Sequence, residues 1–233
     1  MLVKIWSDVR CPFCYIGKKK FEAALEKFPQ KDQVKVEWKS FQLDPTLKTD
    51  TSISTLDYFV KTKGVSKEQA MQMFNGATNM ALEAGIDFNI EDSVPANSFM
   101  AHRLIQFAKS KDLGNEIEEV LFKAHFEEAK NIDDLKVLVQ VATSIGMNAE
   151  EVENILKSDA FAYEVKQDEM EARNIGVSGV PFFVFEDKYA VSGAQSSEAF
   201  LQNLEKSWEE YLLKNPKLEI SKGDSCATDG SCN

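Results

Sequence analysis

Two cysteines separated by two residues carry the clearest chemistry in this sequence. Cys11 and Cys14 flank Pro12 and Phe13, and this C-x-x-C spacing places the two thiols about one helical turn apart. Thiols at this spacing can form and break a disulfide bond reversibly. A thiolate performs the attack in such exchange, so the first cysteine needs surroundings that stabilise its anion. The spacing therefore predicts a redox pair with Cys11 as nucleophile and Cys14 as resolving thiol.

The residues around the pair predict the element that would stabilise this anion. Residues 2–7 alternate and are rich in β-formers, which predicts a strand, and Pro12 suits the first position of a following helix. Unpaired N–H groups at a helix N-terminus stabilise a negative charge. We therefore expect Cys11 to be exposed where the helix begins, and Cys14 to be buried one turn further on.

A zinc half-site is the alternative interpretation of the pair. Structural zinc takes four Cys or His ligands at characteristic spacings. The remaining cysteines, Cys226 and Cys232, are separated by five residues near the C-terminus, and the chain has only two histidines. Because this set does not offer the usual spacing, we expect no metal site.

The rest of the chain predicts an α/β protein with a long helical insertion. Residues 2–41 follow a strand–helix–strand pattern, and helical periodicity then extends from about residue 55 to residue 173. Strands return at 181–185 and 188–192, followed by a final helix over 196–214. A C-x-x-C at a strand-to-helix junction in this context is typical of a thioredoxin-like redox motif.

Capping residues predict where several of the inserted helices begin. Ser66 and Gln69 have the spacing of a capping box. Asp133, Asn148 and Asp159 each precede a helical pattern and are suitable N-cap residues. We therefore expect helices to start at these positions.

A second element of the site is predicted at Val180 and Pro181, which directly precede the apolar strand 181–185. A cis bond between them would turn the backbone groups of Val180 toward Cys11, where they could pair with an extended substrate. A trans proline at the start of a strand is equally compatible with this spacing.

Composition limits the possible partners. The chain has 233 residues and a formal net charge of −11, which disfavours binding to phosphate backbones and anionic lipid. It has no apolar run long enough to span a bilayer and no signal-peptide pattern at its start. We therefore expect a cytoplasmic protein with no nucleic-acid or membrane partner, in a compartment where disulfides are usually catalytic or redox-sensing.

Several segments together resemble the DsbA family of oxidoreductases, and specifically its cytoplasmic FrnE-like branch. They are residues 8–17, 179–184 and 189–195, with helical signatures at 101–103 and 124–126. The resemblance implies a thioredoxin-like fold with an all-helical insertion and disulfide exchange with protein or small thiol substrates. It also implies a cis bond before Pro181. No bound cofactor is expected, and glutathione is a candidate reductant.

The resemblance also suggests domain boundaries. The thioredoxin-like domain would comprise residues 1–54 and 159–214, interrupted by the helical insertion at 55–158. Residues 215–233 are polar and would form a C-terminal tail with a second cysteine pair. FrnE-like proteins often carry such a pair, so Cys226 and Cys232 have two interpretations: an auxiliary redox pair that relays electrons to Cys11, or two exposed thiols.

Phe13 leaves the direction of electron flow open. Periplasmic DsbA proteins carry His at this position, which strengthens the oxidant, and FrnE-like proteins often carry Trp. Phe brings no charge, so an isomerase or reductase role is at least as compatible as an oxidant role. The alternative class is a glutathione-dependent isomerase or transferase, such as 2-hydroxychromene-2-carboxylate isomerases and kappa-class transferases. Those proteins typically have Ser where Cys11 stands, so the two thiols favour disulfide exchange.

Three polar residues have more than one interpretation. His102 lies in a predicted helix and either lines a groove above the cysteines or is a structural or surface histidine, and we favour the second interpretation. Asp8 and Arg10 carry opposite charges next to the redox pair, and their net effect on Cys11 stays open.

Overall fold

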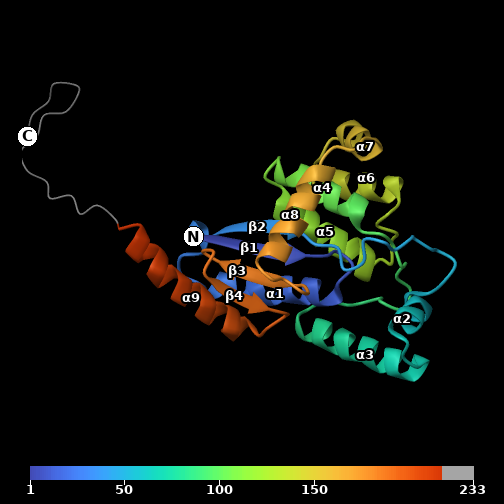
Figure 1. The fold of residues 1–233 in the computed structure, drawn as a ribbon, viewed down its shortest axis with the longest axis horizontal. Coiled ribbons are helices and arrows are strands. Elements are labelled where there is room, and N and C mark those ends of the chain that lie inside the picture. Colours follow the sequence, from blue (N-terminus) through green and yellow to red (C-terminus); the bar gives the residue numbers. More distant parts are fainter. Residues whose placement is uncertain (217–233) are drawn as a thin grey trace, which may run out of the picture.

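A four-stranded sheet forms the centre of the fold (Figure 1). The computed structural model describes residues 1–216, and within them the strands run in the order β2-β1-β3-β4. β1 (Leu2–Ser7) is parallel to β2 (Lys35–Ser40) and antiparallel to β3 (Phe182–Phe185). β4 (Tyr189–Ser192) continues the sheet antiparallel to β3.

Helices cover both faces of this sheet. On one face, α1 (Pro12–Lys27) and α9 (Ser197–Lys214) pack against each other over an aromatic core. The ring centroids of Phe183 and Phe200 lie 4.5 Å apart in that core. On the other face, α8 (Ala162–Asn174) packs on β2. The predicted strand–helix–strand and strand–strand–helix halves are therefore confirmed.

The predicted helical insertion is also present between β2 and α8. Its helices are α2 (Thr55–Lys63), α3 (Lys67–Glu83), α4 (Phe99–Lys109), α5 (Gly114–Phe126), α6 (Leu135–Ser144) and α7 (Ala149–Lys157). They share one hydrophobic core with the start of α1, where the ring of Tyr15 stacks on that of Phe122 with centroids 5.0 Å apart. The insertion thus packs directly against the helix that carries the redox pair. The domain boundaries after residues 54 and 158 stay predictions.

The structure confirms some of the predicted helix starts and corrects others. Ser66 forms the expected capping box, and Asn148 caps α7. The prediction for Asp133 is wrong by one residue, because Asp134 accepts the N–H groups at the start of α6 while Asp133 bonds to Thr49. The prediction for Asp159 is wrong as well: α8 begins at Ala162, after a residue in the left-handed conformation.

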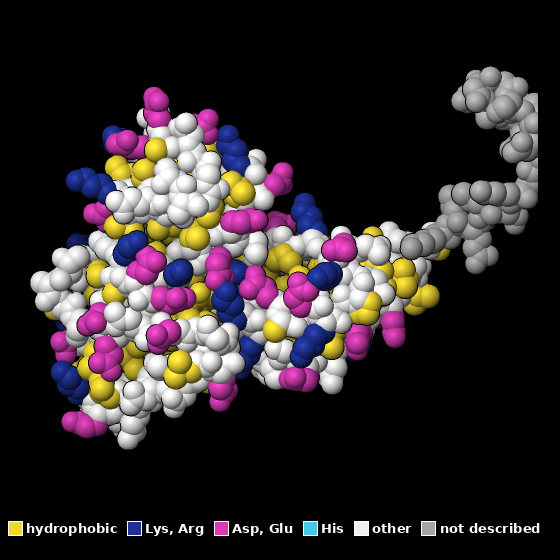
Figure 2. All heavy atoms as spheres, turned by 180° about the vertical axis from the view of Figure 1, so that it is seen from behind, with side chains coloured by type: hydrophobic (Ala, Val, Ile, Leu, Met, Phe, Trp, Pro, Cys, Tyr) yellow, Lys and Arg dark blue, Asp and Glu magenta, His cyan; other side chains and the backbone are white. Residues whose placement is uncertain are grey.

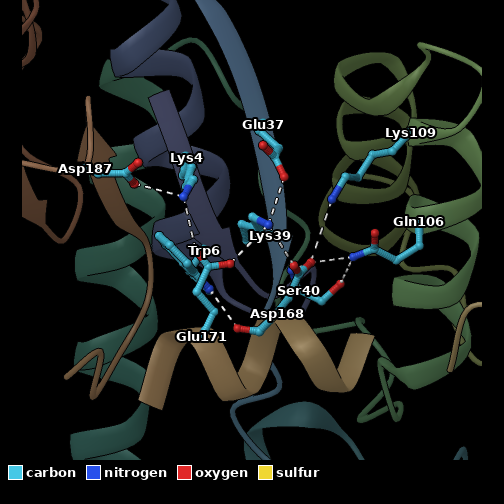
Figure 3. Close-up of polar contacts among 10 residues, drawn as sticks. All are labelled: Lys4, Trp6, Glu37, Lys39, Ser40, Gln106, Lys109, Asp168, Glu171 and Asp187. Carbon is cyan, nitrogen blue, oxygen red and sulfur yellow. Dashed lines mark hydrogen bonds and ion pairs between the residues drawn. The ribbon is translucent and has the colours of Figure 1, made fainter. Parts of the chain in front are cut away.

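A network of charged groups fixes α8 to the sheet (Figure 3). The ammonium group of Lys39 on β2 lies 2.8 Å from Glu37, 3.1 Å from Asp168 and 3.2 Å from Glu171. Asp168 on α8 also accepts the backbone N–H of Ser40 at 2.9 Å. These contacts come from β2 and α8, so the network holds the helix at a fixed place on the sheet.

The surface mixes both signs of charge. On the face in Figure 2, acidic side chains are interspersed with basic ones, and hydrophobic side chains show between them. The negative surplus of the chain is therefore dispersed on this face. Among residues 1–216, no helix is both long and apolar enough to cross a membrane.

Candidate active site

The redox pair lies where β1 leads into α1. Cys11 is the N-cap of α1 with extended backbone angles (φ −93°, ψ 112°), and Pro12 occupies the first helical turn. The backbone N–H of Cys11 donates to the Asp8 carbonyl at 2.9 Å, and that of Cys14 donates to the Cys11 carbonyl at 3.0 Å. Both thiols are free. The predicted place of the pair at the start of a helix is therefore correct.

The bond between Val180 and Pro181 is cis, as the resemblance implied. The Cys11 thiol donates to the Val180 carbonyl at 3.5 Å, so this backbone faces the first cysteine. Gly17 on α1 allows this close approach, because a Cβ there would lie 3.0 Å from Pro181 Cγ. The two predicted elements of the site are thus side by side.

The expectation that Cys11 is exposed is wrong. Its exposure is 5%, against 1% for Cys14, and both side chains belong to the hydrophobic core shared with the insertion. The inserted helices α2 and α3 help to form a cavity of about 490 Å³ next to Cys11, Pro12 and Phe13. The sequence around the pair does not show that distant helices fold over it. Cys11 therefore faces a cavity lined by these helices rather than the open surface.

The cavity is largely apolar. The side chains that line it opposite the redox pair include Tyr58, Phe59, Met73, Phe74, Ala77, Ile90, Val94, Pro95 and Phe126. Phe13 is 42% exposed at this site, so a large ring is available to a bound molecule. An apolar group attached to a sulfur atom would be well accommodated here.

A few polar groups interrupt the apolar lining. The Arg10 guanidinium lies 5.8 Å from the centroid of the Tyr58 ring, and the Tyr58 hydroxyl donates to Asp44 at 3.0 Å. His125 also lines the cavity, where burial and then the charge of Arg10 lower its pKa to about 4. At neutral pH this imidazole is therefore uncharged, and Arg10 is the cation nearest to Cys11 in sequence.

The surroundings of Cys14 fit a resolving thiol, which reacts only after Cys11. Burial, and then the neighbouring Cys11, raise the pKa of Cys14 well above its usual value. The backbone N–H of Asp8 and the hydroxyl of Ser7 act in the opposite direction, because both can donate to a thiolate. Cys14 thus stays protonated in the resting protein.

His102 does not line the cavity. It is fully buried on α4, and its Nε2 lies 3.4 Å from Oδ1 of the buried Asp8. Its neighbour Arg103 donates to the carbonyls of Ile155 and Ala160, near the C-terminal end of α7. The sequence does not predict the Asp8–His102 pair, because the two residues are far apart in the chain and only tertiary packing joins them.

Cys226 and Cys232 lie outside the described residues, so their two interpretations remain predictions. Within residues 1–216, no three His, Cys, Asp or Glu side chains form a group that could hold a metal ion.

Comparison with known proteins identifies the family. Residues 2–205 match the DSBA-like thioredoxin domain. The chain belongs to this family. A probable DsbA oxidoreductase from Streptomyces coelicolor, SCO1869, is 35% identical, with a TM-score of 0.85 over 100% of this chain and 98% of its own. The thioredoxin-like fold with its helical insertion is therefore confirmed.

Two more distant structures share the fold of this DsbA-family protein. A 2-hydroxychromene-2-carboxylate isomerase is 18% identical, with a TM-score of 0.64 over 94% of this chain and 100% of its own. The cytosolic disulfide reductase DsbM from Pseudomonas aeruginosa is 15% identical, with a TM-score of 0.61 over 92% of this chain and 99% of its own. At these identities the likeness concerns the fold alone. The FrnE-like branch stays a prediction.

Proposed function

We propose that this protein is a thiol–disulfide oxidoreductase or isomerase that acts through Cys11 and Cys14. One observation carries the proposal: Cys11 begins α1 opposite the Val180 carbonyl, with Cys14 buried one turn behind it. Free N–H groups at the helix start stabilise the attacking thiolate. The family to which the chain belongs supports the same chemistry.

The reaction would run through a mixed disulfide. The Cys11 thiolate attacks one sulfur of a substrate disulfide, whose S–S bond breaks, and the other substrate sulfur leaves as a thiolate. Cys14 then loses its proton and attacks the sulfur of Cys11, which releases the second substrate thiolate. The substrate disulfide is thereby reduced to two thiols, and Cys11 and Cys14 are oxidised to a disulfide. The reverse sequence oxidises a dithiol substrate.

Access to Cys11 and the lining of the cavity indicate which substrates could react. Because Cys11 is only 5% exposed, a sulfur atom reaches it as part of a small molecule or of an extended segment that enters the cavity. The backbone of Val180 would pair with such a segment, while the apolar lining would hold the side chain next to the sulfur. Protein or small thiols and disulfides both fit this description.

The direction of the reaction follows from what surrounds Cys11. Phe13 adds no positive charge, so we favour a reductase or isomerase over a strong oxidant. A cytosolic disulfide reductase shares the fold of this chain, and one structure of it contains glutathione. We propose a cytoplasmic location for this chain as well, with glutathione as reductant. The alternative, a glutathione-dependent isomerase or transferase, does not require Cys14, which is present and buried here.

Insulin reduction in the presence of glutathione tests the proposal, with two matched variants. We expect wild-type protein to reduce insulin and to accelerate refolding of a scrambled disulfide substrate. Cys11→Ser should lose both activities, whereas Cys14→Ser should accumulate a mixed disulfide at Cys11 that mass spectrometry detects. Full activity in Cys11→Ser would overturn the proposal. Equal behaviour of the two variants would contradict the separate roles of Cys11 as nucleophile and Cys14 as resolving thiol.

A further inference from the structure

Three fully buried titratable groups have no part in the exchange reaction. They are Asp8, which follows β1, His102 on α4 and Glu118 on α5, with exposures of 0%, 0% and 1%. We call them the acid–imidazole cluster, because each acts on the charge of at least one other. Buried charged groups are costly unless they are paired, so each of the three needs a physical explanation.

Asp8 connects this cluster to both cysteines. One carboxylate oxygen accepts the backbone N–H of Leu43 at 2.8 Å, and the other accepts that of Arg10 at 3.1 Å. The carbonyl of Asp8 accepts the N–H of Cys11, and its own N–H acts on the sulfur of Cys14. The backbone of Asp8 is therefore bonded to the loop that holds the two thiols.

His102 supplies the counter-charge to Asp8. Its Nε2 lies 3.4 Å from the Asp8 carboxylate, which is an ion-pair contact rather than a well-aligned hydrogen bond. Burial alone would raise the pKa of Asp8 and lower that of His102. Their mutual attraction reverses both effects, so the pKa of Asp8 is lowered and that of His102 is raised. Both directions favour the charged form of each group, in line with the 3.4 Å contact between them.

Glu118 is the member of the cluster whose charged form is least stabilised. Burial raises its pKa to about 7, against the opposing charges of His102 and Lys18. Within the described chain, its Oε2 and the Nδ1 of His102 have no hydrogen-bond partner. Packing alone does not explain such atoms, because a buried polar atom without a partner lowers stability.

We propose that His102 is a positioning residue of the redox site: its charge neutralises Asp8, so that the Cys11 thiolate does not face an unpaired buried carboxylate. The proposal rests on the proposed function only in assigning Cys11 as the reactive thiol.

Charge-removing variants of the full-length protein test this role of His102. Gln at position 102 can still donate to Asp8 but carries no charge. In reduced protein at pH 7, we expect His102→Gln to slow alkylation of Cys11 by iodoacetamide about tenfold, the effect of about one pKa unit from one uncompensated charge. Tandem mass spectrometry of the peptide that starts at Cys11 separates its modification from that of Cys14.

The double variant separates charge from packing. Asp8→Asn together with His102→Gln removes both charges, so the alkylation rate should return to within about twofold of that of Asp8→Asn alone. A purely structural role would make the double variant at least as slow as His102→Gln. A wild-type rate in His102→Gln, or a double variant as slow as that single variant, would overturn the proposal. Circular dichroism checks that each variant is folded.

These experiments can contradict the role of His102 without contradicting the proposed function, and the reverse is also true. Iodoacetamide reports the reactivity of the Cys11 thiol and needs no disulfide substrate. A protein that does not reduce insulin can therefore still show the predicted differences, and an active oxidoreductase can lack them. The first result would contradict the proposed enzyme activity but support the role of His102. The second would support the enzyme activity and contradict the role of His102.

Discussion

Two charged regions of this molecule, one partly and one fully buried, differ in how completely their groups are paired. In the network of Figure 3, Lys39 contacts three carboxylates, and Asp168 also accepts backbone and side-chain N–H groups. In the acid–imidazole cluster, Glu118 and His102 retain atoms without partners in the described chain. Fully paired charges hold elements together, whereas partly paired ones can gain or lose a proton. The comparison assigns the first region to structure and the second to the redox site.

Removing the central cation should have the largest effect on stability. Lys39→Met leaves Glu37, Asp168 and Glu171 without their shared partner. Because these groups are only partly buried, we expect a cost of about 2–3 kcal/mol, between the values for exposed and for buried ion pairs. Urea unfolding at pH 7 measures the loss. The control is Lys157→Met, which removes an exposed partner of Glu153 and should cost about 0.5 kcal/mol or less.

The comparison also predicts that Lys39→Met leaves Cys11 alkylation unchanged at pH 7, as long as the protein stays folded. A change in this rate as large as that expected for His102→Gln would erase the distinction between the two regions.

Glu118→Gln should change how stability depends on pH. The pKa of Glu118 is raised from 4.5 to about 7, so the folded state holds a proton that the unfolded state has already lost. The free energy of unfolding of the wild type should therefore fall by about 2–3 kcal/mol as the pH rises from 4.5 to 7. Glu118→Gln should lack this decline and be more stable than wild type at pH 8.

Urea titrations at several pH values check this prediction. Glu116→Gln removes an exposed carboxyl from the same helix and serves as the control. A decline of equal size in Glu118→Gln and wild type would show that Glu118 is not the group responsible.

A smaller effect is expected from backbone packing at the redox helix. Gly17→Ala places a methyl group 3.0 Å from Pro181 Cγ, and this overpacking should cost about 1–2 kcal/mol. Gly76→Ala on α3 meets nothing within 4 Å and should instead stabilise the protein by about 0.5–1 kcal/mol, because Ala is the better helix former. Thermal unfolding of both variants measures the contrast, and equal shifts would contradict the close packing at Gly17.

Local features of the site were predictable, and long-range ones were not. The C-x-x-C spacing and Pro12 placed Cys11 correctly at a helix start, because both signals act within one turn. The cis bond before Pro181 needed the family resemblance, since the spacing alone fits either isomer. The burial of Cys11 depends on helices more than forty residues away, and no local pattern reports it. Likewise, His102 alone carries no sign that it pairs with Asp8.

The same limit explains the errors in helix starts. Asp133 and Asp159 are suitable caps by residue type. The first instead bonds to Thr49, and the second precedes α8 by three residues. Tertiary contacts thus decided between neighbouring candidates. By contrast, Ser66 and Gln69 cap α3 through reciprocal contacts with each other's backbone, so the sequence predicted them correctly.

Equilibration against glutathione redox buffers tests the Cys11–Cys14 couple most directly. We predict that Cys11 and Cys14 interconvert between two thiols and one intramolecular disulfide in a single two-electron transition. For a reductase we expect a potential closer to thioredoxin, at about −270 mV, than to DsbA, at about −120 mV. Mass spectrometry of the acid-quenched protein identifies the bond. If Cys11 instead accumulates a glutathione adduct and no bond to Cys14 forms at any ratio, the proposed redox couple does not exist.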